Sequence, residues 1–565
     1  MINYKRLSNL IIVTWIFSII TILITYCLWS LNRGLDMTDE SYYLAAAIHP
    51  ESVVVWATAM HWITSILWDL SGSLVKFRGL GMAILVISSV VFALGVAHAF
   101  ERLANSKLKY HHLLFIVASS LTGALFYNAF VTFTPSYNLL AASGTYIALG
   151  LAFFTLNINT NWLKIFIQIF VGIALGITFL AKFSSGVIAC LIVAAILTVF
   201  RHSFKTLLLN ILALAIGMLT TLAVLILLHT SFADAFAQFK LGALVYMLGA
   251  NETFTVRLLR YIRETSVFLQ LTIIDFYFPL LIYAMHAFRP RTWVALSGLV
   301  SFIYIVVSQG YLFGGMDKYA QQTAPLLVAV ILSLLTMHRK GQLQPKIYFL
   351  FAILLLLPIG ISIGTFNPLH VQIILCLAPW GLLIGLLAVD TKEVYGLTND
   401  RFLLGVVFLS IVTSQIVTNG FRAPYRQYRP FFEQNAPINI PLLGNINLDT
   451  ETRDSYYKLK HLADTCNIKP NEKFIGLYNI PGVSLILQTI TLGMPILQDR
   501  ISTEPILAHF DKTVLNSAIL GINRDTESYD SSMPRQLAAF PQEYRLCGTV
   551  VLPYQKQKLE LWIKN

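Results

Sequence analysis

The run TLLLNILALAIGMLTTLAVLILLH, residues 206–229, decides the fold class of this chain. It contains no Asp, Glu, Lys or Arg. About 20 consecutive apolar residues are what a helix needs to cross the hydrocarbon core of a bilayer. The run therefore predicts a transmembrane helix, and the question is how many others accompany it.

The whole chain has the same character. Of its 565 residues, 56% are hydrophobic and only 12% are charged, whereas soluble proteins average about 25% charged. We identify thirteen apolar stretches of roughly 17 to 25 residues. Together they predict a polytopic α-helical membrane protein with these transmembrane helices: 10–31, 79–99, 112–132, 138–156, 163–181, 185–200, 206–229, 266–288, 292–311, 320–337, 347–364, 370–389 and 402–418.

The distribution of charge predicts an orientation. With a cytoplasmic N-terminus, most Lys and Arg residues before Asn419 fall in cytoplasmic loops, as the positive-inside rule requires. The first apolar stretch has no small-residue cleavage site behind it, so we expect it to stay as an anchor. We therefore predict a multi-pass protein of the cytoplasmic (inner) membrane. The net charge of +12 comes without a basic block interleaved with aromatic residues, so no nucleic-acid partner is expected.

The C-terminal part of the chain differs in composition from the rest. From Asn419 onward charge density is ordinary, and short β-rich runs occur at Phe474–Tyr478 and Thr549–Leu552. We predict two domains, a transmembrane domain over 1–418 and a soluble α/β domain over 419–565. Thirteen spans place the second domain outside the cytoplasm, in the periplasm. There, Cys466 and Cys547 can pair, although the sequence leaves that pairing open.

The most informative polar motif is Asp36-Met37-Thr38-Asp39-Glu40-Ser41-Tyr42-Tyr43, which follows the first apolar stretch. On a helical turn, Asp36 would share a face with Asp39 and Glu40. Crowded carboxylates raise one another's pKa, which suits a general base. The alternative is a helix cap with solvated charges, in which Thr38 or Asp39 begins a helix. Both interpretations stay open.

This motif and a second one carry a family resemblance. Gly176-Ile-Thr-Phe-Leu-Ala-Lys182-Phe-Ser-Ser-Gly186 is similar to a run in which a helix ends at Lys and resumes after Gly. With the many-helix pattern and the outer C-terminal domain, the chain resembles the GT-C superfamily, in particular the protein O-mannosyltransferase and lipid A aminoarabinose transferase families. The resemblance implies an inverting glycosyltransferase that moves one sugar from a polyprenyl-phosphate donor to a hydroxyl on a glycan, lipid or protein acceptor.

The same resemblance assigns roles to the acidic motif. It implies that Asp39 is the base and that Glu40 orients it or substitutes for it. Related enzymes often carry an acidic residue between their third and fourth helices, where this chain reads Thr134-Pro-Ser-Tyr-Asn138. That departure leaves the role of a second carboxylate in doubt.

Several basic side chains are candidates for binding the donor phosphate. The resemblance implies phosphate contact for Lys182, and Lys318 is a weaker candidate. Arg257, Arg260 and Arg263 occupy an arc of about 120° opposite three apolar residues, which predicts a helix lying in the membrane interface with a basic face. These residues either bind the donor phosphate or anchor the chain against membrane lipids.

Other residues near the motif are candidates for acceptor or sugar binding. They are Asp36, Tyr42, Tyr43, Tyr137 and Asn138, and the alternative for the aromatic ones is an interfacial belt. No Cys or His residues have metal-ligand spacing, so we predict neither a metal nor a cofactor. Competing functions are a transporter or flippase, favoured only by Asp275 within an apolar stretch, and a polymerase or ligase of lipid-linked glycans.

Overall fold

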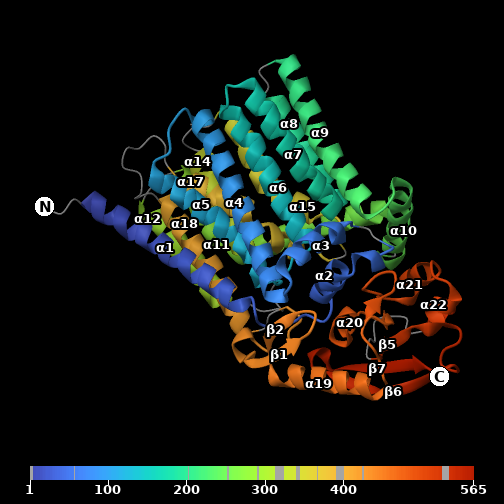
Figure 1. Ribbon diagram of the computed structural model, residues 1–565. Coiled ribbons are helices and arrows are strands. Elements are labelled where there is room, and N and C mark those ends of the chain that lie inside the picture. Colours follow the sequence, from blue (N-terminus) through green and yellow to red (C-terminus); the bar gives the residue numbers. More distant parts are fainter. Residues whose placement is uncertain are drawn as a thin grey trace.

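The computed structural model describes residues 4–55, 58–200, 203–250, 253–288, 292–311, 323–338, 344–365, 367–389, 400–422, 425–524 and 533–565. A bundle of long helices carries a smaller α/β domain at one end (Figure 1). The predicted fold class, a polytopic helical membrane protein with a C-terminal α/β domain, is confirmed.

For every predicted apolar stretch, the residues that the structure describes lie mainly on helices of the bundle. The helices are α1 (Tyr4–Ser30), α4 (Leu74–Ala104), α5 (Tyr110–Leu125), α6 (Tyr137–Phe154), α7 (Asn161–Ala181), α8 (Phe183–Val199), α9 (Phe204–His229), α11 (Phe254–Phe288), α12 (Thr292–Ser308), α14 (Ala324–His338), α15 (Pro345–Ser362), α16 (Leu369–Gln372), α17 (Ala378–Ala388) and α18 (Asp400–Arg422). Within the described ranges, eight helices are long and apolar enough to cross a membrane, or nine if the bent pair Leu369–Cys376 and Ala378–Ala388 is one span. Shorter apolar helical segments are Phe183–Val199, Leu296–Ser308 and Gly405–Thr418.

Small residues let the bundle helices pack closely. A Cβ on Gly95 of α4 would lie 1.9 Å from the carbonyl oxygen of Gly150 of α6. A Cβ on Gly172 of α7 would lie 2.1 Å from the carbonyl oxygen of Leu214 of α9. Lipid gives little hydrophobic drive for helices to associate, so such close backbone packing is what holds a membrane bundle together.

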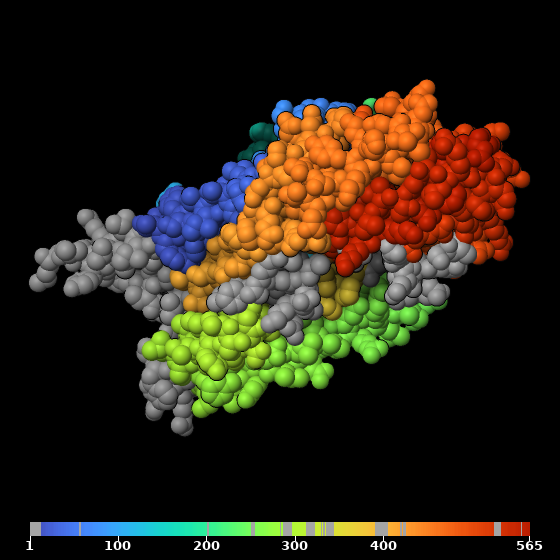
Figure 2. Space-filling model, turned by 90° about the horizontal axis from the view of Figure 1, so that it is seen from below, coloured from blue at the N-terminus to red at the C-terminus, as the bar shows by residue number. Residues whose placement is uncertain are grey.

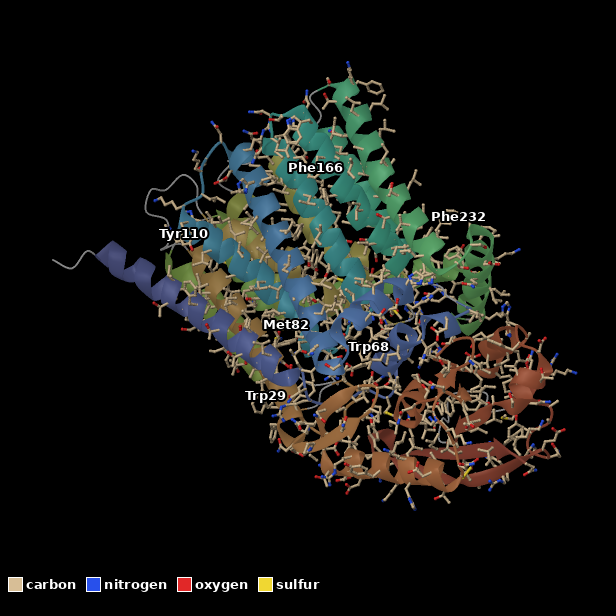
Figure 3. The ribbon with its side chains drawn as sticks, viewed as in Figure 1. Trp29, Trp68, Met82, Tyr110, Phe166 and Phe232 are labelled. Carbon is tan, nitrogen blue, oxygen red and sulfur yellow. A yellow bond between two sulfur atoms is a disulfide. The ribbon has the colours of Figure 1, made fainter. Side chains whose placement is uncertain are left out.

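Three extramembrane segments meet at one end of the bundle. They contain α2 (Asp39–Ile48) with α3 (Met60–Ser71), α10 (Phe232–Ala250) and the C-terminal domain. Trp29, Trp68 and Phe232 lie toward this end, and Tyr110 lies toward the other (Figure 3). The segments that we predicted to share the outer side of the membrane are therefore gathered on one side of the bundle.

The C-terminal domain is built on a mixed sheet. A hairpin of β1 (Ala436–Ile440) and β2 (Gly444–Leu448) precedes α19 (Thr450–Thr465). The five-stranded sheet has the order β4-β3-β5-β7-β6, in which β3 pairs in parallel with β4 and β5, and β7 pairs antiparallel with β5 and β6. The strands are β3 (Lys473–Leu477), β4 (Ile490–Thr491), β5 (Ile519–Asn523), β6 (Tyr544–Leu552) and β7 (Gln557–Lys564). Both predicted β-rich runs fall on strands, and the helices between them are α20 (Pro481–Leu487), α21 (Arg500–Leu507) and α22 (Lys512–Ser517).

The C-terminal domain packs directly against the acidic motif. The Gly482 amide, at the start of α20, donates a 2.9 Å hydrogen bond to the Met37 carbonyl. A Cβ on Gly482 would lie 2.6 Å from the Met37 sulfur and 2.8 Å from Ser41 Oγ. Seen from below, the domain, orange to red, covers this end of the molecule beside the green band that contains α10 and α11 (Figure 2). The motif therefore lies where bundle and domain meet.

Candidate active site

Asp36 shapes the beginning of α2. It is buried, and its carboxylate accepts hydrogen bonds from the backbone amides of Thr38 (2.8 Å), Asp39 (3.1 Å) and Glu40 (3.3 Å). Those amides have no partner within the helix, so Asp36 acts as its cap. Burial raises the pKa of Asp36 to about 6, although the charge of Arg426 opposes the rise. The cap interpretation of the motif thus holds, with Asp36 rather than Thr38 or Asp39 as the capping side chain.

Glu40 is sealed in an ion pair with Arg78 of α4. Its two carboxylate oxygens accept from Arg78 Nε at 2.8 Å and Nη2 at 2.7 Å, and both side chains are nearly inaccessible, at 3% and 1%. Thr132 and Thr134 also donate to Glu40. Burial alone would raise the pKa of Glu40, but the charge and hydrogen bonds of Arg78 outweigh it and hold the pKa below its usual range.

These contacts favour a structural role for Glu40, whereas we predicted that it orients Asp39 or substitutes for it. A carboxylate held by an arginine and two hydroxyls has little tendency to take up a proton. No described contact joins its side chain to that of Asp39, so neither substitution for Asp39 nor direct orientation of it follows from the geometry. The segment Thr134–Asn138 supplies the Thr134 hydroxyl to Glu40.

Asp39 is the accessible carboxylate of the motif. Its side chain is 30% exposed. Arg426, 25% exposed, lies 3.0 Å from Asp39 Oδ1, and the Tyr425 hydroxyl lies 3.3 Å from Oδ2. Arg426 also donates to the Thr38 hydroxyl. Both partners belong to the linker between α18 and the C-terminal domain, so the linker and the motif form one site.

A small cavity opens beside these groups. Its volume is about 30 Å³, which is room for about two water molecules. The described residues that line it come from α2, the loop before α6, the segment after α15 and the linker: Asp36, Asp39, Glu40, Tyr43, Tyr127, Phe130, Val131, Thr132, Thr134, Ser136, Tyr137, Asn138, Asn367, Gln372, Leu375 and Tyr425. Acidic, hydroxyl and amide groups converge here over an aromatic wall, as in sites for polar organic ligands.

Lys182 lies directly behind the cavity wall. It sits between α7 and α8 and is 3% exposed. Its ammonium nitrogen lies 2.8 Å from the Ile361 carbonyl oxygen and 3.4 Å from the side-chain oxygen of Asn138, which lines the cavity. One side chain therefore separates Lys182 from the space beside Asp39.

The three arginines lie on α11. We expected an interfacial helix separate from the next span, but α11 runs from Phe254 to Phe288. No Pro or Gly lies between Arg263 and Pro279, so the helix continues past the arginines, and its kink at Phe276 lies just before Pro279. Arg257 stacks over Tyr246 at 4.5 Å, Arg260 lies 3.7 Å from Glu264, and Arg263 is exposed. The opposite side is apolar and exposed, at 48% for Leu258, 60% for Leu259 and 57% for Ile262.

One loop connects α11 with Lys182. The Tyr261 hydroxyl donates to the Thr365 carbonyl at 3.2 Å and accepts from the Gly364 amide at 3.0 Å. Ser184 donates to the Ile363 carbonyl at 2.6 Å from the other side. The same segment continues to Asn367 and Gln372 in the cavity wall. The basic face of α11 is thus connected to the cavity only through this loop, whereas Lys182 contacts Asn138 of the cavity wall directly.

The other predicted residues divide into three groups. Tyr43, Tyr137 and Asn138 line the cavity, and Tyr42 packs against Tyr43 with ring centroids 5.4 Å apart. Lys318 lies outside the described residues. Over the described ranges, no group of three or more His, Cys, Asp or Glu side chains is arranged to hold a metal ion.

Several site residues escaped the sequence analysis. Arg78 had a usable signal, since an arginine at the edge of an apolar stretch calls for a partner. Tyr425 and Arg426 had none, because they lie in a linker with no motif around them. Gln372 had none either; it is 2% exposed, and its side-chain oxygen has no hydrogen-bond partner in the structure.

Comparison with known proteins finds similarity to solved structures and none to protein-family models or curated proteins. Among solved structures, ArnT from Cupriavidus metallidurans in the apo state aligns with 97% of this chain and 98% of its own, at 10% sequence identity and a TM-score of 0.41. Any functional assignment therefore depends on the site itself.

Proposed function

We propose that this protein is an inverting glycosyltransferase that transfers a single sugar from a polyprenyl-phosphate donor to a hydroxyl acceptor at the outer face of the cytoplasmic membrane. The observation that carries the proposal is the separation of roles among the three carboxylates. All three line the cavity, but Asp36 caps a helix and Glu40 is sealed by Arg78, which leaves Asp39 as the accessible carboxylate, with Arg426 at 3.0 Å.

The reaction needs only the groups that this cavity offers. Phosphate is a weak base and departs without protonation, so one carboxylate that accepts the proton of the acceptor hydroxyl is enough. Asp39 takes that proton as the hydroxyl oxygen attacks the anomeric carbon, and the bond to the donor phosphate breaks. Direct attack inverts the anomeric configuration. A glycosidase would instead need two carboxyls flanking the bond.

Cations on the membrane side support a phosphate at this place. Lys182 is adjacent to the cavity through Asn138, and a desolvated cation stabilises developing phosphate charge strongly. The exposed apolar side of α11, with Leu258, Leu259 and Ile262, suits contact with lipid chains while Arg257 and Arg260 face the protein. A polyprenyl chain can thus lie along lipid-facing helices while its phosphate reaches inward.

The C-terminal domain supports an extracytoplasmic location and an acceptor on that side. Cys466 and Cys547 form a disulfide that joins the end of α19 to β6, and such bonds persist in oxidising compartments. Because this domain packs on the acidic motif, the site lies at the same end of the bundle. We infer that the acceptor, a glycan, lipid or protein, enters from the aqueous side.

The decisive experiment incubates the purified protein in lipid nanodiscs with a panel of polyprenyl-phosphate sugars and candidate acceptors. Consumption of a monophosphate lipid sugar with inversion supports the proposal. Transfer of a whole glycan from a diphosphate lipid indicates a polymerase or ligase instead. Movement of substrate without covalent change indicates a transporter. The residue in the sequence that favoured a transporter, Asp275, accepts a 2.6 Å hydrogen bond from the Tyr311 hydroxyl.

A further inference from the structure

The linker holds Asp39 at both of its oxygens. Arg426 binds Oδ1 at 3.0 Å and Tyr425 donates to Oδ2 at 3.3 Å. The guanidinium and the phenol each take one acceptor position on the carboxylate, about two of its four, so they compete with a substrate hydroxyl for Asp39. Tyr425 also lines the cavity, so the linker limits the space there too.

The grip of Arg426 on Asp39 is of a kind that can be exchanged. Both side chains are a quarter to a third exposed, so water reaches the pair and separating it costs less than separating a sealed pair. Arg426 also has φ of +53°, in the left-handed region that disfavours side chains other than glycine. The Arg426 side chain is therefore not deeply buried, and its backbone is in a strained conformation.

A donor phosphate is a better partner for this arginine than Asp39 is. Arginine binds phosphate through two parallel hydrogen bonds, whereas Arg426 reaches Asp39 through a single contact, to Oδ1 at 3.0 Å. Asp39 and Tyr425 line the cavity, beside which the proposed function locates the donor headgroup. Arg426 contacts Asp39, a residue of the cavity wall, at 3.0 Å.

We propose that Arg426 is an exchangeable cation that binds Asp39 in the resting protein and turns to the donor phosphate when the lipid arrives, which frees Asp39 to act as base. This inference rests on the proposed function and assigns to the linker a part in substrate recognition. It couples occupancy of the donor site to activation of the base, so the sugar donor is not exposed to an active base before it is held.

Competition between Asp39 and phosphate for one guanidinium predicts binding changes of opposite sign. Removing the arginine takes away a phosphate ligand, whereas neutralising Asp39 takes away the competitor. We expect Arg426→Ala to weaken the binding of undecaprenyl phosphate about tenfold and Asp39→Asn to strengthen it about threefold, that is, by roughly 1.4 and 0.7 kcal/mol. The double variant should bind like Arg426→Ala, because the effect of Asp39 passes through Arg426.

The measurement uses the full chain in nanodiscs and undecaprenyl phosphate as the probe, with undecaprenol as the phosphate-free comparison. Arg429→Ala is the matched control, since Arg429 lies in the same linker, is 44% exposed and pairs with Glu451 at 2.9 Å on the surface. We expect this control to bind like the wild type. Arg426→Lys keeps the positive charge and should recover part of the lost affinity. Thermal melting of each variant monitors folding.

The outcomes separate the inference from the proposed function. If the wild type binds undecaprenol as tightly as undecaprenyl phosphate, the proposed lipid-phosphate donor itself fails. If the wild type prefers the phosphate and Arg426→Ala keeps the same affinity, or if Asp39→Asn weakens binding, the exchange is overturned while the proposed function stands. Opposite changes that merge in the double variant support it, because a purely structural role for Arg426 does not produce that pattern.

Discussion

Two carboxylate–arginine pairs lie one residue apart in the sequence and differ in almost every physical respect. Glu40 and Arg78 are 3% and 1% exposed and join α2 to a bundle helix. Asp39 and Arg426 are 30% and 25% exposed and join α2 to the linker of the C-terminal domain. Glu40 receives further hydroxyl donors from Thr132 and Thr134, whereas Asp39 is contacted by Arg426 and Tyr425 of the linker.

The difference indicates what each pair does. A sealed pair that loses one partner leaves an uncompensated buried charge, so it acts on folding. A pair open to solvent contributes little to folding and is free to change partners. The acidic motif is therefore divided between a structural member and a chemical one, and substitutions at the two positions should have separate consequences.

The largest expected effect is on catalysis, at Asp39. Asp39→Asn removes the proton acceptor and should lower sugar transfer by about 10²–10⁴-fold, the usual worth of a general base. Expression, membrane insertion and melting temperature should stay near those of the wild type. Transfer rates with saturating donor and acceptor provide the measurement, and activity near the wild-type level would remove Asp39 from the role of base.

The sealed pair should show the converse behaviour. Arg78→Met leaves Glu40 buried and unpaired, which should destabilise the fold by about 3–5 kcal/mol. In the double variant Arg78→Met with Glu40→Gln, a neutral amide oxygen still accepts from Thr132 and Thr134, so part of the loss should be recovered. The remainder reflects the carbonyls of Leu31, Arg33 and Gly34, which also lose Arg78 as their donor. Melting in detergent compares the three proteins. If Arg78→Met melts like the wild type, the distinction between the two pairs fails.

The same two pairs mark the limit of sequence reasoning. Apolar length is a local property, so each predicted span has a helix, and the motif at residues 36–43 was identifiable because its carboxylates are adjacent. Their arginine partners were not identifiable from the sequence. Arg78 lies 38 residues from Glu40. Arg426 lies 388 residues from Thr38, the neighbour of Asp39 to which it also donates. Which carboxylate is capped, sealed or open depends on tertiary contacts that no local pattern encodes.

The arginines of α11 extend the comparison beyond the motif. If they help to hold the donor phosphate, Arg257→Gln and Arg260→Gln should each raise the KM for lipid donor about tenfold, a loss of about 1.4 kcal/mol, with kcat little changed. Arg263 is exposed, so Arg263→Gln should have the smallest effect and serves as the matched control. Equal donor kinetics for all three variants would identify them as membrane anchors.

The smallest expected effect distinguishes the two buried carboxylates by pH. The pKa of Asp36 is raised to about 6 by burial, so the stabilisation by its protonated form is full below about pH 4 and is lost as pH rises through 6. The pKa of Glu40 is lowered, so its stabilisation is present above its ordinary value and is lost as pH falls below that value. Melting temperatures between pH 4 and 7.5 test this.

As pH rises, the melting temperature of the wild type should fall by on the order of 2 °C relative to that of Asp36→Asn. Relative to that of Glu40→Gln it should rise by a similar amount. Slopes of the same sign would mean that the two carboxylates share one environment.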